Sequence, residues 1–259
     1  MKLEVLLSCM NQNDISIVEK NKITTDVIVI NQCNNIAEEC IQNGKQKILF
    51  VSRNERGIGM SRNTALMKAT ADICLFADDD VTYVDNYEEI ICNEFERHPE
   101  AEMILFNLKF INSKRKFATI KRFEKAHLRS SMRYGAVRIA VKPEVLHKNR
   151  IYFSLLFGGG AKYGAGEDSL FIRDCFKRGV KIYLSPQIIG EVDQKESTWF
   201  TGYNEKYFYD KGALWKSLMG HFSELFYLQY LIRHREEWKS SKIKFIDAFR
   251  LMKNGGNSL

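Results

Sequence analysis

Short apolar runs bounded by polar residues recur through the first 190 residues and predict the strands of a buried sheet. We expect strands at residues 3–8, 26–30, 48–51, 72–77, 103–110, 136–141 and 181–184. Helical spacing and capping residues predict helices at 14–19, 35–43, 61–68, 81–97 after its first turn, 144–148 and 168–178. Strands that alternate with helices indicate an α/β fold whose central sheet is doubly wound and mainly parallel, with helices on both faces.

The pattern changes after about residue 190, where strand signals end and an aromatic-rich helical extension is expected. We therefore divide the chain into an α/β domain at 1–190 and a helical extension at 191–259 that packs on it. Residues 242–253 form a basic amphipathic helix, with apolar side chains on one side and Lys and Arg largely on another. Such a helix either contacts an anionic membrane surface or docks on its own domain.

Composition and charge narrow the class of protein. The 259 residues are 45% hydrophobic and 27% charged, as in an ordinary soluble domain, and no apolar run is long enough to span a bilayer. The six cysteines are scattered without metal-site spacing, which is typical of a reducing compartment, so we expect a cytoplasmic protein. The net charge of +7 suits nucleic acid, an anionic membrane or a phosphate-bearing substrate.

Three consecutive carboxylates, Asp78, Asp79 and Asp80, follow the apolar strand at 72–77. They must emerge at the carboxyl end of the strand, because an unpaired buried carboxylate is too costly, and ligands of open α/β sheets bind at that edge. Adjacent carboxylates repel each other unless a cation lies among them. The triplet therefore indicates either a divalent metal site or a solvated acidic turn.

Two further segments carry candidate chemistry. Arg56 and Arg62 flank a glycine-containing turn at the start of the helix at 61–68, where guanidinium groups and free N–H groups suit a phosphate. A glycine-rich stretch at 157–166 leads into Glu167 and Asp168 at the start of the next helix. Carboxylates there are also good helix caps, so this pair has a structural explanation as well.

Taken together and in order, these segments resemble the glycosyltransferase family 2 enzymes, which have the nucleotide-sugar-binding GT-A fold. The matching segments are Ser8-Cys9-Met10-Asn11-Gln12, Asn31-Gln32-Cys33, Arg56-Gly57 with Ser61-Arg62-Asn63-Thr64-Ala65, Asp78-Asp79-Asp80, and Gly164-Ala165-Gly166-Glu167-Asp168-Ser169-Leu170-Phe171. The resemblance extends over about residues 2–184 and leaves out the C-terminal quarter.

The resemblance implies an inverting transfer assisted by a divalent metal, Mn²⁺ or Mg²⁺. Asp80 would contact the metal, and Asp78 would support the metal or the ribose; Asp79 could do either. The metal would neutralise the charge that develops on the nucleoside diphosphate leaving group. Asp168 would be the base that accepts the proton of the acceptor hydroxyl, with Glu167 orienting it or binding the acceptor.

The donor would be a nucleoside diphosphate sugar, with a UDP-sugar as the first expectation. Ser8 belongs to the matching donor-binding region, Asn31 would contact the base, and Arg56 and Arg62 would contact the nucleotide or its phosphates. Asn31 lacks the charge that relatives often carry there, which leaves the base preference open. Many relatives also supply a late His to the metal, but His221 and His234 lie in helical settings that favour a structural role.

The sequence allows three other interpretations. A nucleotidyltransferase would carry a glycine-rich signature after the first strand, where this chain has none at 8–13. A basic nucleic-acid-binding or membrane-peripheral module leaves the acidic segments unexplained, because carboxylates oppose polyanion binding. An inactive relative is disfavoured by the intact Asp80 and Asp168. We expect a glycosyltransferase of surface polysaccharide synthesis that acts on a glycan or lipid-linked acceptor, at most peripherally bound to the inner face of the membrane, and not on nucleic acid.

Overall fold

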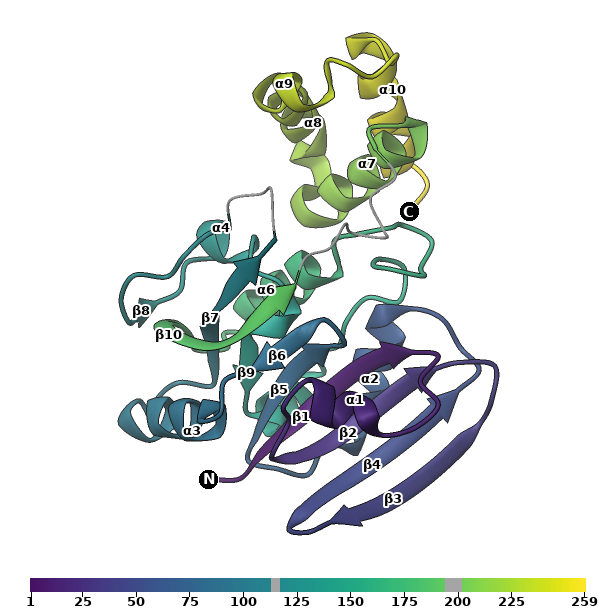
Figure 1. Cartoon of the computed structure of the whole chain (residues 1–259). Helices are drawn as coiled ribbons and strands as arrows, with labels where there is room; N and C mark the ends of the chain where they lie inside the picture. Colours follow the sequence, from purple (N-terminus) through teal and green to yellow (C-terminus); the bar gives the residue numbers. More distant parts are fainter. Residues whose placement is uncertain (113–116, 194–201) are drawn as a thin grey trace.

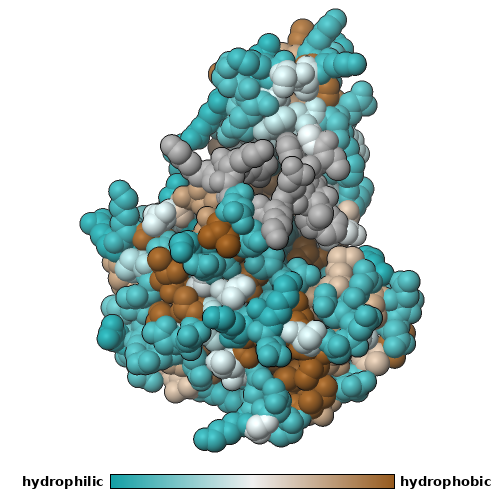
Figure 2. Space-filling model, in the orientation of Figure 1, coloured by the Kyte–Doolittle hydropathy of each residue, from teal (hydrophilic) through white to brown (hydrophobic). Residues whose placement is uncertain are grey.

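The computed structural model describes residues 1–112, 117–193 and 202–259. Figure 1 shows a lobe built around a central sheet and, above it, a helical lobe formed by the end of the chain. Much of the visible surface is hydrophilic, with apolar patches between the polar residues (Figure 2). No helix in the described ranges is long and apolar enough to cross a membrane.

The sheet has the order β3-β4-β2-β1-β5-β9-β7-β10-β6, with β8 paired to β10. The strands are β1 (Leu3–Met10), β2 (Asp26–Gln32), β3 (Ala37–Asn43), β4 (Gln46–Arg53), β5 (Ile73–Asp78), β6 (Val81–Tyr83), β7 (Met103–Ile111), β8 (Glu124–Lys125), β9 (Ile139–Val141) and β10 (Ile182–Asp193). Strands β4, β2, β1 and β5 form one parallel block, and β7 and β10 are also parallel. Between them β9 runs antiparallel to both neighbours, so the sheet is mixed. The predicted α/β class is confirmed.

Helices cover both faces of the sheet, as expected for a doubly wound fold. They are α1 (Ser16–Lys20), α2 (Ile58–Lys68), α3 (Tyr87–Arg97), α4 (Leu128–Ser131), α5 (Pro143–Asn149) and α6 (Glu167–Lys177), with a 3₁₀ turn η1 (Ala136–Arg138). Alternate residues of β1 point to opposite sides. Val5 and Leu7 join a core with α1 and α3, whereas Leu6 joins a second core with α2, α5 and α6.

Four predicted elements differ from the structure. Of the strand predicted at 136–141, only Ile139–Val141 is a strand, because residues 136–138 form the turn η1. Residues 35–43 do not form a helix, because Ala37–Asn43 pairs antiparallel with β4 as an edge strand. Gly44, with a φ of +62°, lies in the turn of this hairpin. Residues 81–83 form the short strand β6 before α3 starts at Tyr87, and the predicted strand at 181–184 continues through a register shift to Asp193.

The helical extension has its own apolar core. It comprises α7 (Glu205–Met219), η2 (Gly220–Phe222), α8 (Ser223–Arg233), α9 (Arg235–Trp238) and α10 (Phe245–Gly256). Phe208, Tyr227 and Trp238 are buried there. A separate core is consistent with a boundary near residue 190, which stays a prediction.

The last helix, α10, is docked on the extension itself. Ala248 and Met252 are fully buried, and Gly255 packs against the α7 backbone at Tyr209 so closely that a Cβ atom would clash. The apolar side of the predicted amphipathic helix is therefore largely used inside the protein. Of the two interpretations left open by the sequence, the structure supports docking.

Candidate active site

The predicted site residues of the first lobe gather at the carboxyl edge of the parallel block. Ser8 on β1 pairs with Asp78 on β5 in one direction, and the next residue, Cys9, pairs with Asn31 on β2 in the other. Parallel strands bring their carboxyl ends to the same edge, so Ser8, Asn31 and Asp78 lie side by side. The helices α2 and α6 add Arg62 and Asp168 to this edge, as the contacts below show.

Arg62 connects the carboxylates of this edge. Its Nη2 atom donates to both oxygens of Asp78, at 3.0 and 3.1 Å, and its Nη1 atom donates to Asp168 at 2.8 Å and to Glu167 at 3.4 Å. The side chain is only 3% exposed, and the guanidinium lies 5.3 Å from the centre of the Phe153 ring. The three carboxylates keep its pKa above the usual range despite burial. Arg62 thus holds β5 and α6 together, and its contact with donor phosphates stays a prediction.

Glu167 and Asp168 occupy the first turn of α6. The turn follows Gly166, which has a φ of +117° and lies against Leu214 of α7, so a larger residue would be strained and crowded there. Burial, followed by the charge of Asp168, raises the pKa of Glu167 to about 7. Burial also raises the pKa of Asp168, while Arg62 opposes the shift. A carboxylate with a raised pKa can accept a proton near neutral pH.

The acidic triplet divides into one paired and two unpaired carboxylates. Asp78 is bound by Arg62, whereas no ion pair joins Asp79 or Asp80 to another described residue. Lys20 of α1 donates to the Asp79 carbonyl at 3.3 Å. Although the Asp80 side chain is exposed, loss of solvation within the turn and the charges of Asp78 and Asp79 raise the pKa of Asp80 to about 6.

These carboxylates fit a divalent metal only in part. Within the described ranges, no group of three or more His, Cys, Asp or Glu residues is arranged to hold a metal ion. Mg²⁺ is often held by one or two carboxylates together with substrate phosphates and water, and Asp80 suits that arrangement. His234 binds Glu237 at 2.7 Å inside the extension, which agrees with the structural role expected for it.

A cavity of about 460 Å³ opens beside Asn31 at the carboxyl ends of β1, β2 and β4. The Asn31 amide accepts from the Gln12 backbone at 2.9 Å and donates to the Gln12 carbonyl at 2.8 Å. Asn31 therefore fixes the loop that walls the cavity. The cavity is lined by Asn11, Gln12, Asn13, Asp14, Ile15, Asn31, Cys33, Asn35, Ala37, Glu39, Ile41, Phe50 and Ser52.

Ser8 and Arg56 contact protein groups near this cavity. The hydroxyl of Ser8 is buried and lies 2.8 Å from that of Ser61, which fixes α2 on β1. Arg56 is exposed and donates to the Cys33 carbonyl at 3.0 Å and to the Asn34 side chain at 2.9 Å. It therefore lies next to the loop after β2, whose residue Cys33 lines the cavity.

The helical extension contacts the glycine-rich loop at 157–166 and fixes it in place. The sequence predicted the loop but not this contact. Asp210 of α7 accepts from the Gly164 N–H at 2.9 Å and binds Lys206 at 2.6 Å. The Tyr163 hydroxyl lies 2.8 Å from the Ser258 hydroxyl. The loop just before Glu167 is thus fixed by residues 46 and 95 positions further along the chain, and no local pattern could have indicated those partners.

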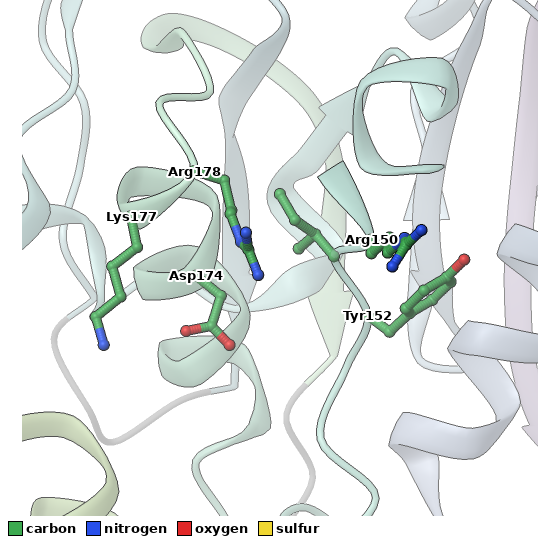
Figure 3. Close-up of a pocket in the computed structure, with 6 residues that line it drawn as sticks. Arg150, Tyr152, Asp174, Lys177 and Arg178 are labelled. Atoms are coloured by element: carbon green, nitrogen blue, oxygen red, sulfur yellow. The ribbon is translucent and has the colours of Figure 1, made fainter. Parts of the chain in front are cut away.

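A second cavity, of about 480 Å³, lies at the other end of α6 (Figure 3). It is lined by Arg150, Ile151, Tyr152, Asp174, Lys177 and Arg178. An 11-residue helix is roughly 15 Å long, so this cavity lies well away from Glu167 and Asp168. Asp174 is the one acidic residue in this lining, and it is bound by Arg173 at 2.7 Å. The lining therefore has no cluster of carboxylates like the one at the carboxyl edge of the parallel block.

Several solved structures have a similar fold. The chain matches the crystal structure of S. aureus TarS 1–349 in complex with UDP-GlcNAc with a TM-score of 0.65 and 16% identity, over 98% of this chain and 84% of that one. The match to TarS 1–349 in complex with UDP has a TM-score of 0.64 and 15% identity, over 94% and 76%. At this identity the likeness shows the fold alone. A comparison with curated proteins gives no match.

The sequence itself matches a family model. The model is that of glycosyl transferase family 2, and the match covers residues 3–158, which is more than half of the chain and includes the acidic triplet, Arg62 and the cavity beside Asn31. The resemblance stated from the motifs is therefore confirmed, and the protein is a glycosyltransferase that belongs to glycosyl transferase family 2.

Proposed function

We propose that the protein is an inverting, metal-dependent glycosyltransferase that moves a sugar from a UDP-sugar to a hydroxyl of a glycan or lipid-linked acceptor. The observation that carries the proposal is the set of three carboxylates that Arg62 ties together at the carboxyl edge of the sheet. A nucleoside diphosphate sugar as donor is supported by the TarS structures, which contain UDP-GlcNAc and UDP. Surface polysaccharide synthesis is the setting that such an acceptor suggests.

In the proposed reaction the acceptor oxygen attacks the anomeric carbon from the side opposite the UDP group. The new glycosidic bond forms as the bond between that carbon and the diphosphate oxygen breaks, and the acceptor proton passes to Asp168. Arg62 holds Asp168 by one oxygen, and a quarter of the Asp168 side chain stays exposed to meet the acceptor. Glu167 shares the guanidinium and positions Asp168. A divalent metal held at Asp80 would neutralise the diphosphate charge.

The donor nucleoside is proposed to bind in the cavity beside Asn31. Its volume of about 460 Å³ suits a nucleoside, and the walls offer backbone and amide groups to a base edge and Phe50 to a ring. Arg56 beside the cavity would reach the diphosphate, which extends from the nucleoside towards the acidic triplet. Asp78 and Asp79 would complete the ribose or phosphate contacts.

A location on the inner face of the membrane fits the six free cysteines, which suit a reducing compartment, and the exposed surface of α8. Leu225 and Ile232 are 67% and 61% exposed, Leu228 is 43% exposed, and Phe222 precedes them at 69%. Their spacing places these side chains on one side of the helix. We propose this side, and not α10, as the surface that faces a lipid-linked acceptor.

The test is calorimetric titration of the full chain with UDP and UDP-sugars, with Mn²⁺ and with a chelator. We expect metal-dependent binding of UDP that weakens at least about tenfold, or 1.4 kcal/mol, in Asn31→Ala, because the ordered cavity wall is lost. Release of UDP that depends on an added saccharide acceptor, above the rate of donor hydrolysis without it, would show transfer. Absence of nucleotide binding under all conditions would contradict the proposal and favour a non-catalytic module.

A further inference from the structure

A strongly basic segment lies beside the proposed base. Residues 117–138 contain six Lys and Arg residues and one acidic residue, Glu124, whereas the whole chain has a net charge of only +7. Glu124 is already bound by Arg122 at 2.8 Å. The segment therefore carries most of the excess positive charge of the protein, and its remaining cations have no carboxylate of their own within the segment.

The end of this segment is attached to the start of α6. A Cβ atom at Gly135 would lie 3.4 Å from a carboxylate oxygen of Asp168, so the backbone at this point approaches the proposed base closely. The Ser169 hydroxyl donates to the Met132 carbonyl at 2.7 Å. Residues 132–136 thus form a wall of the site next to the proposed base, and the two arginines at 133 and 138 belong to the same stretch of chain.

Arg138 is a buried cation with no counter-ion among the described residues. It is 3% exposed, and its described contacts are a single 3.3 Å hydrogen bond to Asn107 and the rings of Phe110 and Tyr134, at 5.1 and 5.2 Å. Burial, and then the charge of Arg133, lower its pKa to about 10. No other hydrogen bond joins this guanidinium to a described residue.

Arg133 places a second guanidinium on the same ring. It is exposed and lies 5.4 Å from the centre of Tyr134, and no ion pair joins it to a described acidic residue. The charge of Arg133 lowers the pKa of Arg138, so the two guanidinium groups repel each other, and a bound anion would offset this repulsion. A buried, unpaired charge is costly to keep, which is why such groups usually have a partner.

We propose that Arg133 and Arg138 form an anion-binding subsite on the acceptor side, and that the acceptor carries a phosphate or carboxylate group near the hydroxyl that is glycosylated. This inference rests on the proposed function for the placement of the acceptor, but the subsite itself is defined by these two side chains. Guanidinium groups bind phosphate and carboxylate through paired hydrogen bonds. Binding of the acceptor would neutralise the pair and bring its hydroxyl to Asp168.

The test is calorimetric titration of the full chain, loaded with UDP, with glucose 6-phosphate and with glucose. We expect binding of the phosphate ester only, and a loss of about tenfold or more in Arg138→Gln and in Arg133→Gln, because one charge-assisted hydrogen bond is removed from each. Arg129→Gln is the matched control, since Arg129 is an exposed cation of the same segment and should change the affinity by less than about twofold.

Equal binding of glucose, or an equal loss in Arg129→Gln, would overturn the subsite. Because Arg133 is exposed, Arg133→Gln keeps the test valid even if Arg138→Gln fails to fold. Binding to phosphatidylglycerol vesicles that depends on Arg138, without binding of the soluble ester, would move the anion from the acceptor to the lipid and overturn the proposal. Titration of UDP alone is read separately, so failure of the donor site is distinguished from failure of this one.

Discussion

Replacement of Arg62 with Met would remove the cation that three carboxylates share while keeping much of the buried apolar stem. Breaking a buried ion pair from one side typically costs about 3–5 kcal/mol, because the partner charge is left uncompensated. Arg62 is 3% exposed and bonded to Asp78 and Asp168 at 2.8–3.1 Å, so its removal belongs to this class. For a protein of this size we expect the midpoint of thermal unfolding to fall by about 10 °C at pH 8.

The same variant should regain stability in acid. The pKa of Glu167 is raised from 4.5 to about 7 in the folded protein, so the folded state holds this proton more tightly than the unfolded chain. Stability from this group is full below pH about 4.5 and is lost as the pH rises through about 7. Without Arg62 the carboxyl pKa values rise further, and the loss between pH 5 and pH 8 becomes larger than in the parent.

Thermal unfolding at pH 5 and pH 8 would measure both effects. Arg56→Met is the control, because Arg56 is exposed and bound only to neutral groups of neighbouring loops. Its free energy of unfolding should stay within about 0.5 kcal/mol of that of the parent at either pH. If Arg62→Met lost the same stability at both pH values, or behaved like Arg56→Met, the view of Arg62 as the shared counter-ion would be refuted.

Three further variants test the proposed chemistry. Asp168→Asn should lower kcat by about 10²–10⁴-fold while calorimetry shows unchanged UDP affinity, and a kcat near that of the parent would exclude Asp168 as the base. Asp80→Ala should abolish the gain in UDP affinity that Mn²⁺ gives, and persistence of the gain in the variant would refute the metal role. In the parent this gain should fade below pH about 6, because protons then compete with the metal for Asp80. Asp210→Asn should loosen the glycine-rich loop and, in the same assays, reduce kcat more than UDP affinity. A loss of UDP binding alone would contradict the role of Asp210 in supporting the loop before Glu167.

The sequence was sufficient to predict elements whose cause is local. The apolar run before Asp78 and the glycines before Glu167 indicate a strand end and a helix start, and both occur where expected. The segment at 35–43 was predicted wrongly because its polar residues fit a surface helix as well as an exposed edge strand. Only the pairing with β4 decides between them, and pairing is a tertiary effect.

The role of Arg62 could not be read from its surroundings in the chain. An arginine near a glycine turn suggests phosphate binding, whereas in the structure its partner Asp168 lies 106 positions away. The same holds for Asp210, whose contact with Gly164 spans 46 positions. Residue types predicted which groups enter the site, but the pairing of charges within it depends on how the two lobes and the strands meet.

The positive net charge of the chain is unevenly distributed around the proposed active site, and this distribution bears on the choice of acceptor. At the proposed base the carboxylates of Asp78, Glu167 and Asp168 share the single guanidinium of Arg62, so that part of the site is acidic even with its counter-ion in place. Beside it, Arg133 and Arg138 have no acidic partner among the described residues. A neutral saccharide could place a hydroxyl at Asp168 but would leave the two arginines without an anion. An acceptor with a hydroxyl at Asp168 and an anionic group at the arginines would complement both, and this is why we expect charge on the acceptor to be a main determinant of specificity.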